Sequence, residues 1–170
     1  MTPDSRLMSY SRGEITHLVM PHMQNILGDL FGGDLMALVD QAAAVAAIRH
    51  AGGPAGGNSA GGWGVTAGGP AVTRSIHRLD FHRSIPVGAL VTCLATVDFV
   101  GNSSMDITVE VYSEQVSSGR REHTHSAHVV FVAVDHDRKP KRVPRLVAET
   151  PEELARYERA RRYREVGQGK

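Results

Sequence analysis

One unbroken run of helix-forming residues, 32–50, limits what this chain can fold into. It is rich in Ala, Leu and Met and contains no proline, so it predicts a single helix of about five turns. Asp34 near its start and Arg49 near its end carry the charges that suit the helix dipole. The pair Gly52-Gly53 then supplies a stop signal. Any fold for this chain must bury one face of a long helix made largely of small residues.

Most of the remaining chain has a hydrophobic period of two, which is typical of half-buried β-strands. The pattern predicts strands at 15–20, 72–81, 91–99, 105–111 and 123–134. Gly101-Asn102 predicts a tight hairpin between two of them. A second helix is predicted at 151–165, where Thr150 is a suitable N-cap and Pro151 takes the first helical position. This order favours an α+β fold in which an antiparallel sheet covers the long helix and its edge strands allow dimerisation.

Length and composition favour one domain and exclude several classes of function. The 170 residues carry a net charge of only +1, whereas a nucleic-acid binder usually has a strongly basic face. Cys93 is the single cysteine, so no intrachain disulfide can form. Neither a membrane-spanning run nor a signal-type segment is evident, and we expect a cytoplasmic protein with no membrane or nucleic-acid partner. We divide the chain into an irregular N-terminal extension (1–14), a main domain (15–148) with a glycine-rich loop (51–71), and a C-terminal helix and tail (149–170).

Asp40 is the most informative single residue, because it lies among small apolar residues of the predicted long helix. A helical period places it beside Gly33, Met36, Ala37, Ala43, Ala44 and Ala47. A carboxylate buried on such a stripe costs several kcal/mol unless it is paired or protonated. One interpretation is a general base, since buried carboxylates often serve this role. The other is a structural carboxylate that accepts hydrogen bonds from backbone amides and fixes a loop.

A second candidate feature is the approach to this helix. Asn25 comes before Gly28, Gly32 and Gly33, which allow tight turns and leave backbone N–H groups free at the helix start. Such N–H groups can bind negative charge, including the oxyanion formed when a carbonyl is attacked. A turn needed only for close packing would give the same glycine pattern.

Together these residues resemble the acyl-CoA thioester hydrolase family of the hotdog superfamily. The resemblance rests on Asn25, Gly28, Phe31-Gly32-Gly33, Leu35-Met36, Asp40 and Ala43, with further matches at Val72-Thr73, Phe81, Gly88, 100–105 and 131–135. It implies the hotdog fold, a long central helix wrapped by a curved antiparallel sheet, followed here by a C-terminal helix. It also implies a homo-oligomer, a dimer at least, commonly a hexamer built as a trimer of dimers.

The resemblance further implies hydrolysis of an acyl-CoA to a free acid and CoA. Asp40 would act as general base or nucleophile and Asn25 would orient the water or the carbonyl, the two being supplied across a dimer interface. Backbone N–H groups near Gly32 and Gly33 would stabilise the oxyanion. Gly101, Ser103 and Ser104 match the segment that lies beside CoA in relatives. Arg83 is a candidate for a phosphate contact, with Lys139, Lys141 and Arg142 as weaker candidates. An ordinary surface or turn role is the alternative for each of these residues. No cofactor is expected, because CoA is part of the substrate.

Some residues depart from the family pattern or favour other functions. Ser84 and Ala89 replace a proline and an aspartate that relatives usually carry, which leaves any CoA contact there in doubt. A non-catalytic acyl-CoA-binding or regulatory module is the alternative function, although such a module does not need Asp40. A hotdog dehydratase would need a histidine near the helix start, whereas His50 is at the other end. No metal site is expected: His123 and His125 are predicted on one strand face, His128 on the other, with no acidic partner evident.

Overall fold

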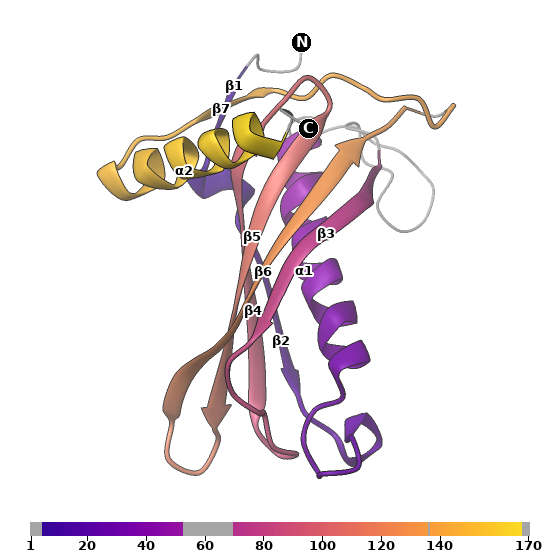
Figure 1. Ribbon diagram of the computed structural model, residues 1–170, viewed down its shortest axis with the longest axis vertical. Coiled ribbons are helices and arrows are strands. Elements are labelled where there is room, and N and C mark those ends of the chain that lie inside the picture. Colours follow the sequence, from indigo (N-terminus) through magenta and orange to yellow (C-terminus); the bar gives the residue numbers. More distant parts are fainter. Residues whose placement is uncertain (1–4, 53–69, 136, 168–170) are drawn as a thin grey trace.

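The computed structural model describes residues 5–52, 70–135 and 137–167 (Figure 1). Its centre is a five-stranded antiparallel sheet in the order β2-β4-β5-β6-β3. The elements are α1 (Gly32–Ala51), α2 (Pro151–Gly167), β2 (Gly13–Leu18), β3 (Ala71–Phe81), β4 (Leu90–Val100), β5 (Ser104–Gln115) and β6 (Arg120–Ala133). This arrangement confirms the predicted α+β fold, the long helix, the order of the main elements along the chain and the hairpin at Gly101-Asn102. Within the sheet β3 pairs with β6 and not with β4, which follows it in sequence.

Helix α1 packs on one face of the sheet, here called the inner face, and this contact forms the hydrophobic core. Its buried side chains meet alternate residues of the strands, among them Val91, Cys93, Ala95, Ile107, Val109 and Val129. At Gly13 the strand β2 and the helix approach at backbone distance, since a Cβ there would lie 2.5 Å from the carbonyl oxygen of Ala42. The small residues of α1 therefore allow the sheet to wrap closely around it, which is why an alanine-rich helix suits this fold.

Helix α2 covers the opposite face, here called the outer face, near one end of the sheet (Figure 1). This contact uses charged side chains. Arg156 donates from Nε to Asp98 Oδ1 at 2.9 Å, and Arg164 Nη1 lies 3.3 Å from Asp106 Oδ2. Burial raises the pKa of the Asp106 carboxyl, and the nearby Arg164 and His128 only partly oppose this. The outer face is therefore held by partly buried ion pairs and the inner face by apolar packing.

The N-terminal stretch is more ordered than the sequence predicts. Strand β1 (Ser5–Leu7) pairs in parallel with β7 (Arg145–Val147), and Met8 after it is fully buried. The expectation that 1–14 is irregular is therefore wrong for this part, because two short strands far apart in the chain stabilise each other. Most of the predicted glycine-rich loop, 53–69, lies outside the described residues. Within the described parts of the chain, no helix combines the length and apolar character needed to cross a bilayer.

Candidate active site

The amino end of α1 lies at the opposite end of the sheet from α2 (Figure 1). Phe31 is the N-cap residue, and the helix begins with Gly32 and Gly33. A Cβ on Gly33 would lie 2.5 Å from the Phe31 ring, so glycine at this position lets the ring fold back over the helix start. The first N–H groups of a helix have no partner within the helix. Donors of this kind can bind negative charge, which is the role that the sequence predicts for Gly32 and Gly33.

Asn25 shapes the turn that leads into this helix. Its side-chain Oδ1 accepts hydrogen bonds from the backbone N–H of Leu27 at 2.8 Å and of Asp29 at 3.2 Å. The backbone N–H of Asn25 also donates to the carbonyl oxygen of Asp29. These side-chain bonds end on Oδ1 and do not use the NH2 group of Asn25. The residue is therefore held rigidly while its amide donor is not needed by the turn.

A cavity of about 420 Å³ lies beside these two features. It is bounded by the helix start, the turn 25–29, the segment after β3 and one residue of β6. The lining residues are Asn25, Leu27, Asp29, Leu30, Gly32, Leu35, Phe81, His82, Arg83, Ser84, Ile85 and His125. Three sequence-predicted residues, Asn25, Gly32 and Arg83, are thus brought together at one cavity.

His125 in this cavity is placed differently from the sequence expectation. The pairing of β5 with β6 shifts between Val111 and Tyr112, so that Thr124 is an extra residue opposite them. This bulge turns His125 to the inner face opposite Val111, whereas His123 stays on the outer face beside Glu110. The prediction that His123 and His125 share a face with no acidic partner is therefore wrong, because a bulge interrupts the period of two.

Burial controls the ionisation of His125. The residue is 3% exposed, and burial lowers its pKa to about 4, with His82 and His123 contributing in the same direction. Its imidazole is therefore neutral near pH 7. Phe81 lies edge-on to the ring, with the two ring centroids 5.2 Å apart. A neutral imidazole in this position can donate a hydrogen bond from one nitrogen and accept one at the other, but it carries no charge.

Asp40 lies two turns further along α1 than Gly32 and is half-buried in the single chain. Thr73 of β3 donates from Oγ1 to Asp40 Oδ1 at 2.6 Å. The predicted apolar stripe divides here, because Ala43 and Ala47 are buried while Met36 and Ala37 remain exposed. The single chain therefore does not bury Asp40 as fully as expected. The carboxylate accepts from a side-chain hydroxyl and not from a backbone amide, which disfavours the loop-fixing interpretation.

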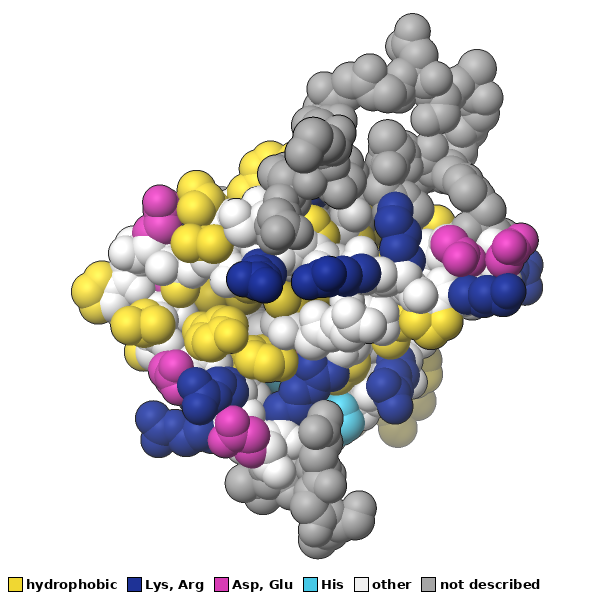
Figure 2. Space-filling model, turned by 90° about the horizontal axis from the view of Figure 1, so that it is seen from above, with side chains coloured by type: hydrophobic (Ala, Val, Ile, Leu, Met, Phe, Trp, Pro, Cys, Tyr) yellow, Lys and Arg dark blue, Asp and Glu magenta, His cyan; other side chains and the backbone are white. Residues whose placement is uncertain are grey.

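The predicted CoA contacts lie at opposite ends of the sheet. Arg83 is at the α1 amino end, where its Nη1 lies 3.0 Å from Glu122. Gly101, Ser103 and Ser104 form the β4–β5 turn at the α2 end, where Arg164 donates to the buried Ser104 hydroxyl. Figure 2, seen from the α2 end, shows several Lys and Arg side chains gathered there. Within one protomer the two groups cannot contact the same short ligand segment.

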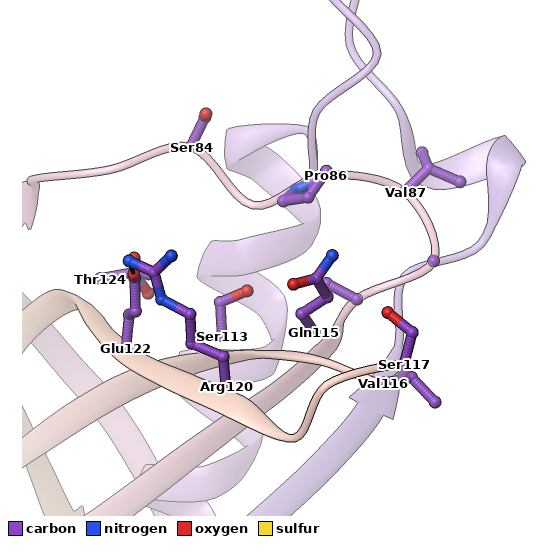
Figure 3. Close-up of a pocket in the computed structure, with 12 residues that line it drawn as sticks. Ser84, Pro86, Val87, Ser113, Gln115, Val116, Ser117, Arg120, Glu122 and Thr124 are labelled. Carbon is purple, nitrogen blue, oxygen red and sulfur yellow. Dashed lines mark ion pairs between the residues drawn. The ribbon is translucent and has the colours of Figure 1, made fainter.

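A second cavity of about 610 Å³ adjoins the first and shares Ser84 with it (Figure 3). It lies between the segment 84–89 and the hairpin that joins β5 to β6. Glu122 forms ion pairs there with both Arg120 and Arg83. Two guanidinium groups therefore share one carboxylate, so the three side chains together carry a net charge of about +1. This charge could attract an anionic ligand.

Sequence reasoning missed two residues of this region. Thr73 was part of the matched pattern, but only the fold shows that its hydroxyl contacts Asp40. His125 was concealed by the bulge at Thr124. Among the residues that the structure describes, no cluster of His, Cys, Asp or Glu side chains is arranged to hold a metal ion.

Comparison with known proteins gives a consistent result. A family model described as Thioesterase superfamily matches residues 27–119. The chain is 34% identical to an uncharacterised acyl-CoA thioester hydrolase, YkhA, of Bacillus subtilis over 90% of this chain and 80% of the relative. It is 31% identical to the cytosolic acyl coenzyme A thioester hydrolase of Mus musculus over 93% of this chain. That match spans only 38% of the mouse protein.

Solved structures show the same similarity. A hexameric acyl-CoA thioesterase superposes with a TM-score of 0.82 and 34% identity, covering 95% of this chain and 93% of that one. An acyl-CoA hydrolase of Staphylococcus aureus, solved with butyryl coenzyme A and coenzyme A, gives a TM-score of 0.81 at 29% identity over 96% and 90% of the two chains. Variants of that enzyme with an Asp, an Asn or a Thr replaced by Ala have also been solved.

Proposed function

The chain belongs to the thioesterase superfamily, the hotdog family of thioester hydrolases, and we propose that it hydrolyses an acyl-CoA to a free acid and CoA. The observation that carries this proposal is the pair formed by Thr73 and Asp40. The hydroxyl holds the carboxylate in one orientation at the edge of an exposed apolar helix face. A carboxylate fixed in this way is suited to take a proton from water or to attack a carbonyl.

The proposed site needs two copies of the chain. At 1.5 Å per residue, the eight residues from Gly32 to Asp40 place them about 12 Å apart along the helix axis. The oxyanion donors and the carboxylate of one protomer are therefore too far apart to act on one carbonyl. Met36 is 44% exposed and Val72 is 49% exposed on this side, as an interface with a second protomer would require. In the proposed dimer, Asp40 of one copy faces the helix start and Asn25 of the other.

The proposed reaction follows from these positions. Asp40 takes a proton from water while the water oxygen adds to the thioester carbonyl carbon, or its carboxylate attacks that carbon directly. The N–H groups near Gly32 and Gly33 stabilise the oxyanion, and Asn25 orients the water or the carbonyl with its NH2 group. Collapse of the intermediate breaks the C–S bond, and the CoA thiolate leaves and takes up a proton. No metal or organic cofactor is needed in this scheme.

The relatives support these assignments. The Asp and the Asn replaced in the Staphylococcus aureus variants are the same number of positions apart as Asn25 and Asp40. A threonine was replaced in a third variant. In this chain we propose that Thr73 acts by holding Asp40. For CoA we propose Arg83 of one protomer together with Gly101, Ser103 and Ser104 of a neighbouring one. A hexamer of three dimers is the proposed assembly, as the hexameric structural relative suggests.

Release of free thiol from acyl-CoAs tests the proposal. We expect Asp40→Asn to lower kcat/KM by about 10²- to 10⁴-fold, the usual contribution of a general base. The matched control is Asp80→Asn, because Asp80 is a half-buried carboxylate of β3 that pairs with Arg78. Wild-type protein that binds acyl-CoA without releasing thiol would instead be a non-catalytic binding module.

Mixing two inactive variants tests the shared site. In a mixed dimer of Asn25→Ala and Asp40→Asn chains, one site contains both substitutions and the other contains neither. Random exchange of protomers should therefore restore about a quarter of the wild-type activity. Mixed dimers that form and remain inactive would show that both residues act within one protomer.

A further inference from the structure

His125 is a buried polar side chain to which the proposed reaction assigns no role. It is 3% exposed, and its Nδ1 atom is buried without a hydrogen-bond partner among the described residues. Its ring lines the same cavity as Asn25 and Gly32. Buried polar groups in native proteins are nearly always paired, so an unpaired nitrogen on a ring that lines a cavity requires an explanation.

The surroundings of His125 indicate a missing partner from outside the chain. The Phe81 ring packs edge-on against His125 and offers no conventional hydrogen-bond acceptor. Phe81 is 59% exposed and so is able to move without disturbing the core. Both rings line the cavity, so a ligand that displaced the Phe81 ring would approach the imidazole from this side. A ligand that enters the cavity would then meet a neutral ring able to donate from one nitrogen and accept at the other.

The depth of the cavity residues matches the order of groups in an acyl-CoA. Arg83, whose side chain is 63% exposed, lies at the rim, where phosphates would remain in solvent. Asn25 and Gly32, both half-buried, come next and would meet the thioester. His125 and the apolar Leu30, Leu35 and Ile85 are buried deepest. These buried residues would therefore meet the acyl group, which is the part of the substrate beyond the thioester.

From this arrangement we propose that His125 is a specificity residue that hydrogen-bonds an oxygen of the acyl group. This inference rests on the thioesterase activity proposed above. The preferred substrate class is then a short acyl-CoA that carries a hydroxyl or keto oxygen near the thioester, and not one with a plain alkyl chain. A site built to hydrogen-bond a substrate oxygen discriminates strongly against the analogue that lacks it, because the polar group of the site is then left unpaired.

A matched pair of substrates tests the proposal. We expect wild-type protein to have a kcat/KM for 3-hydroxybutyryl-CoA at least about tenfold above that for butyryl-CoA, and His125→Leu to remove this preference. His125→Asn places an amide close to the position of Nδ1 and should retain part of it. The control is His128→Leu, because His128 also has a buried unpaired Nδ1 but lies on the outer face of the same strand. That control should keep the wild-type ratio.

The outcomes separate this proposal from the one on which it depends. Equal kcat/KM values for the two substrates in wild-type protein, or an unchanged ratio in His125→Leu, would overturn the role of His125 while leaving the hydrolase activity intact. If neither substrate releases thiol, the hydrolase proposal fails. Calorimetry of wild type and His125→Leu would then give the ratio of the dissociation constants for the two substrates. A preference for the hydroxylated substrate that His125→Leu removes would support the role of His125. Equal dissociation constants in wild type would overturn that role.

Discussion

A buried histidine lies at each end of helix α1, His50 of the helix itself at one end and His125 of β6 at the other. The two histidines differ in their hydrogen bonding. At the carboxyl end, His50 is fully buried and both of its nitrogens are used. Its Nε2 donates to the carbonyl oxygen of Pro144 at 2.9 Å, so its Nδ1 accepts from the Ser11 hydroxyl at 2.8 Å. At the amino end, His125 borders a cavity with Nδ1 unpaired, beside a helix start whose first N–H groups have no partner within the helix.

This difference separates stability from function along one helix. The carboxyl end joins α1 to the N-terminal segment and to the chain before β7, and every polar group of His50 contributes to that contact. The amino end leaves donors and acceptors unpaired, which costs stability unless a ligand completes them. Proteins commonly keep such unfavourable local features where they bind or react. We therefore expect substitutions at the two ends to act on different properties.

The largest expected effect is at the carboxyl end. His50→Leu keeps the side-chain volume but removes the short hydrogen bonds of two buried groups. The Pro144 carbonyl loses the bond from His50, and the Ser11 hydroxyl keeps only a long bond of 3.4 Å to the carbonyl oxygen of Leu7. Each unpaired group costs about 1–3 kcal/mol, so the free energy of unfolding should fall by about 4 kcal/mol. Urea unfolding measures this change. His50→Gln can replace one of the two bonds and should lose less; equal stability of His50→Leu and wild type would show that this end is not the stabilising one.

A pH titration of stability gives the next largest effect and concerns the amino end. Burial lowers the pKa of His125 from 6.5 to about 4, so the folded protein binds fewer protons than the unfolded chain between these values. The stability from His125 is therefore complete above about pH 6.5 and is lost as the pH falls toward 4. The loss is about 3 kcal/mol, since one pKa unit corresponds to about 1.4 kcal/mol.

The difference between wild type and His125→Leu isolates this contribution. The variant should unfold in urea with a shallower dependence on pH between 6.5 and 4. Burial also lowers the pKa of His50, so part of the acid sensitivity must remain in the variant. An identical pH dependence in the two proteins would mean that His125 is accessible to protons in the folded state.

The sequence predicts the fold well because the fold depends on local patterns. The run 32–50 forms α1 from Gly32 to Ala51, since its propensity and its apolar face favour the same structure. The alternation persists in β5 and from Val91 to Val97 in β4, where the apolar side chains pack in the core. An irregular pairing after Val97 interrupts it and places Phe99 beside Tyr157 of α2 on the outer face. Asp40 and Thr73 illustrate the limit. Periodicity identifies the carboxylate as unusual, but only the packing of β3 beside α1 brings the hydroxyl to it.

The differences between the two ends could not be predicted from the sequence. One extra residue at Thr124 reverses the face of His125, and a bulge of this kind leaves no clear trace in a pattern of period two. The partners of His50 lie 39 and 94 residues away in the chain, at Ser11 and Pro144. Contacts of that range depend on the whole fold, whereas helix and strand patterns depend on neighbours. The sequence identified the residues at the helix start, but not the cavity beside them.

Two glycines give the smallest effects and the most direct comparison of the two ends. A Cβ at Gly33 would lie 2.5 Å from the Phe31 ring, and one at Gly52 would lie 2.8 Å from the carbonyl oxygen of Ile48. The Phe31 ring is exposed and free to move, so the Gly33→Ala protein should be as stable as wild type. The moved ring should disturb the helix start and lower kcat/KM by about tenfold, or about 1.4 kcal/mol. The Ile48 carbonyl belongs to the helix, so Gly52→Ala should lower the free energy of unfolding by about 1 kcal/mol.

Thiol-release kinetics and urea unfolding on both variants measure the two properties together. Gly52→Ala should retain the wild-type kcat/KM, because the carboxyl end of α1 lies about 30 Å along the helix from its amino end. Gly32→Ala is the local control, since a Cβ there would lie at an ordinary 3.7 Å from Phe81 and should lower kcat/KM less than Gly33→Ala. If both glycines changed the same property, the division of α1 into a stabilising end and a functional end would be wrong.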